Sequence, residues 1–156
     1  SSGSIPFLHV VDSEILAFSQ GKTRRGSYAA YMDMSHPEII EFLEMRKPSG
    51  GDIHRKCLNL HHAINISDEF MQLIEKCIAE PTYDDSWNLI DPHTKNVVRT
   101  VSARELWQKI LELRLTTGEP YLHFIDESNR KMPKWLKDQG LKINQSNLCF
   151  SLFDFE

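Results

Sequence analysis

Residues 145–149, close to the end of the chain, combine side-chain amides with a single thiol and are the first candidate for chemistry. The thiol of Cys149 is a potential reactive group, and Asn147 can hydrogen-bond a hydroxyl beside it. A lone cysteine is nevertheless more often a small buried apolar side chain than a reactive one. The segment therefore predicts a site only in combination with a second segment far upstream.

That second segment is the polar, basic loop at residues 19–27, in which Gly21 and Gly26 allow close approach of the backbone to a ligand. Its cations supply donors for phosphate groups or base edges: Lys22, Arg24 and Arg25. The loop lies between an apolar segment and an expected buried strand, where α/β folds carry ligand-binding loops. The alternative is a solvated basic turn. No phosphate-loop or dinucleotide fingerprint is present, so we expect neither a standard kinase nor a dehydrogenase site.

The histidines and the other cysteines do not predict a metal site. His61 and His62 are adjacent, so on a strand they point to opposite faces and cannot both bind one metal. Cys57 and His61 could share a face, but no second pair completes a zinc site. Cys77 lies on an apolar helical stripe and is expected in the core. Three aromatic side chains are interpreted as packing residues: Trp87, Trp107 and Trp135.

The composition is typical of a globular domain, with 40% hydrophobic and 26% charged residues. At 156 residues, the chain is one domain or part of a larger one. The net charge of -4 supports neither nucleic acid nor a membrane surface as a partner, and no apolar run approaches the roughly 18 residues of a membrane span. Three scattered cysteines are too few for a disulfide framework, which favours a reducing cytoplasm.

Apolar periodicity and turn residues predict an alternating series of helices and strands. Helices are expected at residues 7–18, 39–47, 68–80, 103–117 and 134–139. Strands are expected at residues 28–34, 58–66, 87–90, 96–101 and 121–125, with the third and fourth forming a hairpin, and the cysteine segment follows. This order favours an α/β sheet or barrel with helices outside.

Three helix starts carry capping residues. Ser35 with Glu38 and Ser102 with Glu105 have the spacing of capping boxes, in which the serine hydroxyl and the glutamate carboxylate each accept a backbone N–H. Ser67 is expected to cap the helix between them.

Both ends of the chain predict a fragment of a longer protein. Residues 1–4 run into an apolar helix without a starting methionine. Residues 150–156 stop within an alternating apolar pattern, which is typical of a strand that needs neighbours.

Taken together, residues 19–31, 35–39 and 145–149 resemble the large, catalytic subunit of class I ribonucleotide reductase. The resemblance is collinear from about residue 5 to residue 149 and includes residues 117–121. It implies that residues 1–149 are part of a ten-stranded α/β barrel and that residues 150–156 are a non-matching tail.

The resemblance also implies roles for the two candidate segments. Cys149 would become a thiyl radical that removes the ribose 3′ hydrogen, and Asn147 would hydrogen-bond the substrate. Gln20 and Arg24 match positions that meet substrate and effector. The specificity loop, which transmits the identity of a bound deoxynucleotide effector to the active site, would consist of Ser19, Gln20, Gly21, Lys22, Thr23, Arg24, Arg25 and Gly26.

For cofactors and partners, the resemblance implies that nothing is bound directly except nucleotides. The radical would come from a metal-containing small subunit, and ATP or deoxynucleoside triphosphates would act as effectors. The expected partners are the small subunit, the remaining part of the large subunit, the ribonucleotide substrate, and thioredoxin or glutaredoxin. No metal, membrane or nucleic-acid contact is expected, and the location would be cytoplasmic.

The sequence departs from the family pattern after Cys149, where Ser151 replaces a glutamate that handles the 3′ hydroxyl proton. A serine cannot replace a carboxylate base near neutral pH without a partner. The tail is an intein start with Cys149 as its nucleophile, the end of a split-gene half, or a truncation. We expect the isolated chain to be inactive. The alternative function is a non-catalytic module that docks on another chain, its basic loop binding a nucleotide or nothing.

Overall fold

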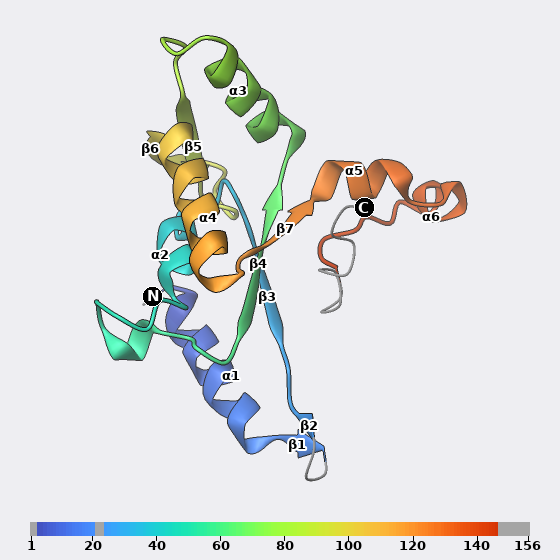
Figure 1. Cartoon of the computed structure of the whole chain (residues 1–156). Helices are drawn as coiled ribbons and strands as arrows, with labels where there is room; N and C mark the ends of the chain where they lie inside the picture. Colours follow the sequence, from blue (N-terminus) through green and yellow to red (C-terminus); the bar gives the residue numbers. More distant parts are fainter. Residues whose placement is uncertain (1–2, 21–23, 147–156) are drawn as a thin grey trace.

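A computed structural model describes residues 3–20 and 24–146, and a parallel sheet organises them (Figure 1). The sheet consists of β3 (Ala29–Asp33), β4 (His61–Ile66) and β7 (Tyr121–Phe124), in the order β3-β4-β7. Both strand pairs are parallel, so long crossover connections carrying helices join them. The predicted α/β class is confirmed, and the described residues form no closed barrel.

The remaining elements occupy the crossovers and the two ends of the described chain. The helices are α1 (Ile5–Ala17), α2 (Ile39–Glu44), the 3-10 helix η1 (Ile53–Arg55), α3 (Asp68–Ala79), α4 (Ala103–Thr117), α5 (Ile125–Lys131) and α6 (Lys134–Asp138). The short strands β1 (Ser19–Gln20) and β2 (Arg24–Arg25) pair with each other, as do β5 (Ser86–Ile90) and β6 (Val97–Ser102). No helix in the described ranges is both long and apolar enough to cross a membrane.

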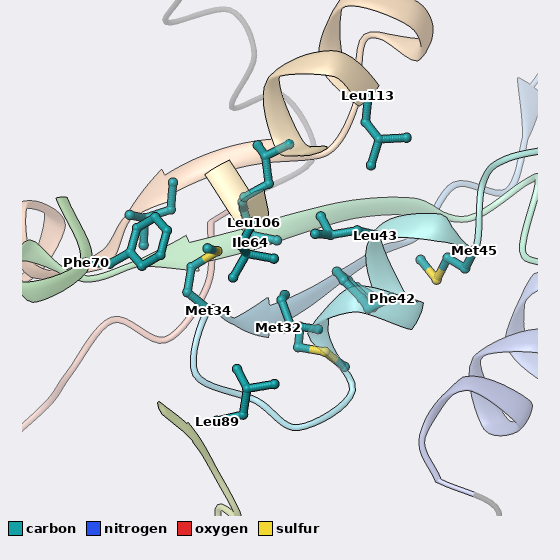
Figure 2. Close-up of a cluster of buried hydrophobic side chains, with 14 of the residues drawn as sticks. Met32, Met34, Phe42, Leu43, Met45, Ile64, Phe70, Leu89, Leu106 and Leu113 are labelled. Carbon is teal, nitrogen blue, oxygen red and sulfur yellow. The ribbon is translucent and has the colours of Figure 1, made fainter. Parts of the chain in front are cut away.

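The core lies where the sheet meets α2 and α4. Figure 2 shows side chains from β3, β4, α2 and α4 in this cluster, including Met32, Ile64, Phe42 and Leu106. The central strand β4 is a nearly continuous run of buried residues, as expected for a parallel strand with neighbours on both sides. The hydrophobic burial therefore fixes the strands against the helices that connect them.

Two polar contacts join peripheral elements to this core. The Asp12 carboxylate of α1 accepts hydrogen bonds from the backbone N–H groups of Asn59, at 2.7 Å, and Leu60, at 2.6 Å, just before β4. The Trp87 indole of β5 donates to the Met34 carbonyl at 3.1 Å, after the end of β3. The first helix and the hairpin are thus both tied to the sheet.

Several predicted helix and turn features are confirmed. The Ser67 hydroxyl accepts from the N–H of Phe70 at 3.3 Å and caps α3. The Ser102 hydroxyl accepts from the N–H of Glu105 at 3.1 Å and caps α4, which ends at Thr117 and is followed by Gly118 with a φ of 76°. Strands β5 and β6 form the predicted antiparallel hairpin.

The capping box predicted at Ser35 and Glu38 is wrong. The Glu38 N–H donates to Nδ1 of His36 at 3.1 Å, and no side chain caps α2. The Glu38 carboxylate instead accepts from the backbone N–H and the hydroxyl of Ser4, at 2.9 and 2.8 Å. A tertiary contact with the start of α1 has replaced the local one, and α2 ends at Glu44 rather than at residue 47.

Two further expectations differ from the structure. Helix α5 was not predicted, because its sequence IDESNRK carries no apolar stripe at helical spacing. Trp135 of α6 was expected to pack, but its side chain is 62% exposed in the described part of the chain. Cys77 is buried on α3, as predicted.

Replacing Ile64 tests the central position of β4. The Ile64→Ala variant should lose about 2–5 kcal/mol of unfolding free energy, because Ile64 is fully buried and truncation leaves a cavity. Urea denaturation followed by circular dichroism measures the loss. The control, Leu115→Ala, removes a side chain that is 87% exposed and should change stability by less than about 0.5 kcal/mol. Equal losses in the two variants would contradict this packing.

Candidate functional site

A cavity of about 900 Å³ opens beside the carboxyl ends of β3 and β4. In open parallel sheets, ligands bind outside the carboxyl ends of the strands, where side chains from several strands converge. Residues lining the cavity include Tyr31, Asp33, Asn65, Ser67, Trp87 and Asn144. The mixture of hydroxyl, carboxylate, amide and aromatic groups suits a polar organic ligand with a flat ring.

The side chain of Asn65, on β4, is the centre of a hydrogen-bond network at this edge. Its Nδ2 donates to Oδ1 of Asp33 at 2.9 Å and to the backbone carbonyl of Asn144 at 3.0 Å. Its Oδ1 lies 2.8 Å from Nδ1 of His123, whose Nε2 lies 2.9 Å from the Ser128 hydroxyl. Burial lowers the pKa of His123, so the neutral ring donates from Nδ1 and accepts at Nε2. The amide of Asn65 therefore has one orientation that satisfies all its partners.

Asn129, on α5, holds the segment that follows α6. Its Oδ1 accepts from the N–H of Ile143 at 2.8 Å, and its Nδ2 donates to the carbonyl of Ile143 at 2.9 Å. Nδ2 also donates to the carbonyl of Ile125 within α5, at 2.9 Å. The Asn129 amide thus hydrogen-bonds both the N–H and the carbonyl of Ile143, the two groups that a neighbouring β-strand would bond.

Tyr31, on β3, provides a third anchor through its hydroxyl. Burial raises the pKa of Tyr31, while hydrogen bonds to the backbone and side chain of Ser146 oppose the rise. Its ring meets the ring of His123 edge to face, with centroids 6.0 Å apart. Residues 143–146 are thus held along the carboxyl end of the sheet. Asn147 and Cys149, the predicted catalytic residues, follow directly and lie outside the described residues.

The predicted basic loop is a β-ribbon at the opposite end of β3. Its paired Cα positions are Ser19 with Arg25 and Gln20 with Arg24. Figure 1 shows this ribbon beyond the amino end of β3, away from α5 and α6. Gly21, Lys22 and Thr23 lie outside the described residues, as do the side chains of the paired positions. Within the described residues, the two predicted segments are therefore not adjacent.

Gly26 closes the ribbon against the end of α1. Its N–H donates to the carbonyl of Phe18 at 2.8 Å, and a Cβ at this position would lie only 3.0 Å from the same oxygen. A larger residue would push the two backbones apart. The close backbone approach predicted at Gly26 is therefore made to the Phe18 carbonyl at the end of α1.

A second polar cluster surrounds the carboxylate of Glu119, before β7, at the amino end of the sheet. Arg46 Nε lies 3.1 Å and His62 Nδ1 lies 2.9 Å from Oε2, and His61 Nδ1 contacts Oε1. The two adjacent histidines meet different oxygens of this one carboxylate, a shared partner that the sequence did not predict. No group of three or more His, Cys, Asp or Glu side chains in the described ranges could hold a metal ion.

The pKa values in this cluster follow from its burial and charges. Burial alone would raise the pKa of Glu119, but hydrogen bonds from His62 and His61 and the charge of Arg46 lower it to about 2. Burial lowers the pKa of His62, against the effect of Glu119. The carboxylate therefore stays ionised and paired across the physiological range.

Apart from His61 and His62, the polar residues at the two ends of the sheet were not predicted as site residues from the sequence. Asn65, His123 and Asn129 are separated by many residues and belong to no local motif, so only the fold brings them together. Glu119 was noted only as part of a family-like stretch, without a role. The available signal for the carboxyl edge was Asn65, a polar residue near the end of an apolar run, followed at Ser67 by a helix-capping residue.

Comparison with known proteins adds the family context. Residues 1–154 match the family of ribonucleotide reductase barrel domains. The chain is 56% identical, over 149 residues, to the ribonucleoside-diphosphate reductase large subunit of Invertebrate iridescent virus 6, covering 96% of this chain and 15% of that protein. It is 41% identical, over 196 residues, to the corresponding subunit of Invertebrate iridescent virus 3, covering 96% of this chain and 31% of that protein.

The fold also matches a solved structure of the same family. The class Id ribonucleotide reductase alpha subunit of Actinobacillus ureae superposes with a TM-score of 0.67 at 27% identity. The match covers 96% of this chain and 22% of that chain. The present chain therefore spans less than a third of the length of each of these proteins.

The Glu119→Gln variant tests the charge pairing at the amino end. Because the folded-state pKa of Glu119, about 2, is below its ordinary value of 4.5, the carboxylate contributes stability above pH 4.5 that is lost as the pH falls towards 2. The variant should lose about 3 kcal/mol at pH 7 and show a flatter decline in acid. Denaturant titrations from pH 7 to pH 2.5 measure this, with Glu75→Gln, at an exposed position of α3, as control. An unchanged pH dependence would refute the pairing.

Proposed function

The chain belongs to the ribonucleotide reductase barrel-domain family, and on that premise we propose that it is part of the catalytic large subunit of a ribonucleoside-diphosphate reductase. The whole subunit would reduce ribonucleotides to deoxyribonucleotides by radical chemistry. The observation that carries the proposal is the anchoring of residues 143–146 beside the cavity at the carboxyl end of the sheet. That segment leads directly into Asn147 and Cys149.

In the proposed reaction, Cys149 as a thiyl radical removes the hydrogen atom from the ribose 3′ carbon. The sulfur–hydrogen bond that forms is weak enough for the hydrogen to be returned later to the same carbon. An enclosed pocket protects the radical from solvent and from side reactions. Asn147 hydrogen-bonds the substrate beside the thiol, so that the reacting atoms are held in contact.

The basic ribbon is proposed to sense which nucleotide is bound. Gln20 and Arg24, on its paired strands, would meet substrate and effector groups. A guanidinium offers several donors in a fixed plane and suits either a phosphate or a base edge. Lys22 and Arg25 add positive charge to the same short segment. The nucleotide effectors would be ATP and deoxynucleoside triphosphates.

Activity is proposed to need the rest of the large subunit and its usual partners. These are a small subunit that generates the radical through its metal centre, and thioredoxin or glutaredoxin as the reductant. Ser151 stands where the family pattern has a proton-handling glutamate, and a serine hydroxyl is far too weak an acid–base group for that step. We propose that a carboxylate from the remaining part of the large subunit handles the 3′ hydroxyl proton, either in place of Ser151 or as its partner.

The Cys149→Ala variant of the full large subunit tests the proposed role of the thiol. With small subunit, reductant and effector present, deoxynucleotide formation should fall by at least about 10³-fold, because the group that accepts the hydrogen atom is gone. The control is Cys77→Ala, which removes a thiol that is buried on α3 and does not line the cavity. Retained turnover in Cys149→Ala would refute the proposal.

A further inference from the structure

We propose that Asn65 is a positioning residue for the thiol of Cys149, with Asn129 as a second anchor of the same segment. The inference rests on the proposed function, because it concerns the placement of the thiol in that reaction. It goes beyond that function in assigning a role to residues outside the Asn147–Cys149 segment, on β4 and on α5.

The first argument is the path of the chain. Asn65 holds the carbonyl of Asn144 at 3.0 Å, and Asn129 holds both backbone groups of Ile143. Cys149 is five positions after Asn144 in the sequence, so the anchored residues lead directly into the thiol segment. The two amides therefore set where the thiol segment leaves the sheet.

The second argument is the complete use of the Asn65 amide. Both hydrogens of Nδ2 are donated, one to Asp33 and one to Asn144, and Oδ1 faces Nδ1 of His123. The side chain is 8% exposed, so each of these groups would be costly to leave unpaired. An aspartate of the same shape would present only acceptors to the Asp33 carboxylate and the Asn144 carbonyl. Repulsion would release the segment while the volume of the core stayed unchanged.

The catalytic consequence is a loss of alignment. Hydrogen-atom transfer needs sulfur and ribose carbon in contact, and a displacement of about 1 Å can cost about 10²-fold in rate. In the full enzyme, the rest of the barrel supplies most contacts with the nucleotide. Loss of the anchor should therefore lower kcat much more than it raises KM.

The experiment uses the full large subunit with its small subunit, a dithiol reductant and a ribonucleoside diphosphate. Asn65→Asp should lower kcat by about 10²-fold and Asn129→Leu by about 10-fold, with KM within about threefold of the parent. The matched control is Asn96→Asp, the same substitution at an exposed asparagine of the β5–β6 hairpin that does not line the cavity. This control should stay within about twofold of the parent.

The rate at which iodoacetamide alkylates Cys149, measured by mass spectrometry, gives a second readout. It should change in both test variants and not in Asn96→Asp, because only the test variants alter the placement of the thiol. An unchanged kcat in folded Asn65→Asp would overturn the inference, as would a rise in KM with kcat unchanged. If Asn65→Asp fails to fold, an unchanged kcat in Asn129→Leu overturns it.

The inference and the proposed function fail separately. If Cys149→Ala is inactive while Asn65→Asp and Asn129→Leu keep full kcat, the function stands and the positioning role is wrong. If Cys149→Ala keeps its activity, the proposed function is wrong, and the positioning role is lost with it.

Discussion

The structure depends on one constraint, which is that the nearly buried amide of Asn65 must have every polar atom paired. The pairing draws Asp33 from β3, His123 from β7 and the carbonyl of Asn144 from the end of the described chain to the same point. A parallel sheet makes this possible, because the carboxyl ends of all three strands meet at one edge. Pairing the Asn65 amide therefore holds the chain at Asn144 against the carboxyl edge of the sheet.

The two ends of the sheet use polar groups for different purposes. At the amino end, Glu119 collects Arg46, His61 and His62 around one carboxylate, which ties the start of β4 to the turn before β7. That cluster is ionic, compact and remote from the described cavity lining. At the carboxyl end, the network is made of amides, a neutral imidazole and hydroxyls, and it borders the cavity. An ion-paired cluster therefore stabilises one edge of the sheet, and the candidate chemistry lies at the other.

Much of the local structure could be predicted from the sequence, because local signals control it. Ser67 and Ser102 cap their helices as their spacing predicts, and the apolar run ending at Ile66 forms the central strand. The prediction fails where a distant partner competes, as when Ser4 takes the Glu38 carboxylate from the expected capping box. It also fails for α5, in which no residue is buried and polar side chains make the tertiary contacts, such as Asn129 with Ile143 and Asp126 with the N–H of Asp68.

The candidate site was only partly predictable for the same reason. Cys149 and Asn147 are conspicuous as residue types at close spacing, whereas Asn65 and Asn129 are ordinary until the fold places them beside Asn144 and Ile143. The most direct measurement is a crystal structure of the full large subunit with a ribonucleoside diphosphate bound. Our account predicts the Asn144 carbonyl on the Asn65 amide, with the Cys149 sulfur against the ribose at the carboxyl ends of β3 and β4. A nucleotide bound there with residues 143–146 detached from the sheet, or with the sulfur facing elsewhere, would contradict it.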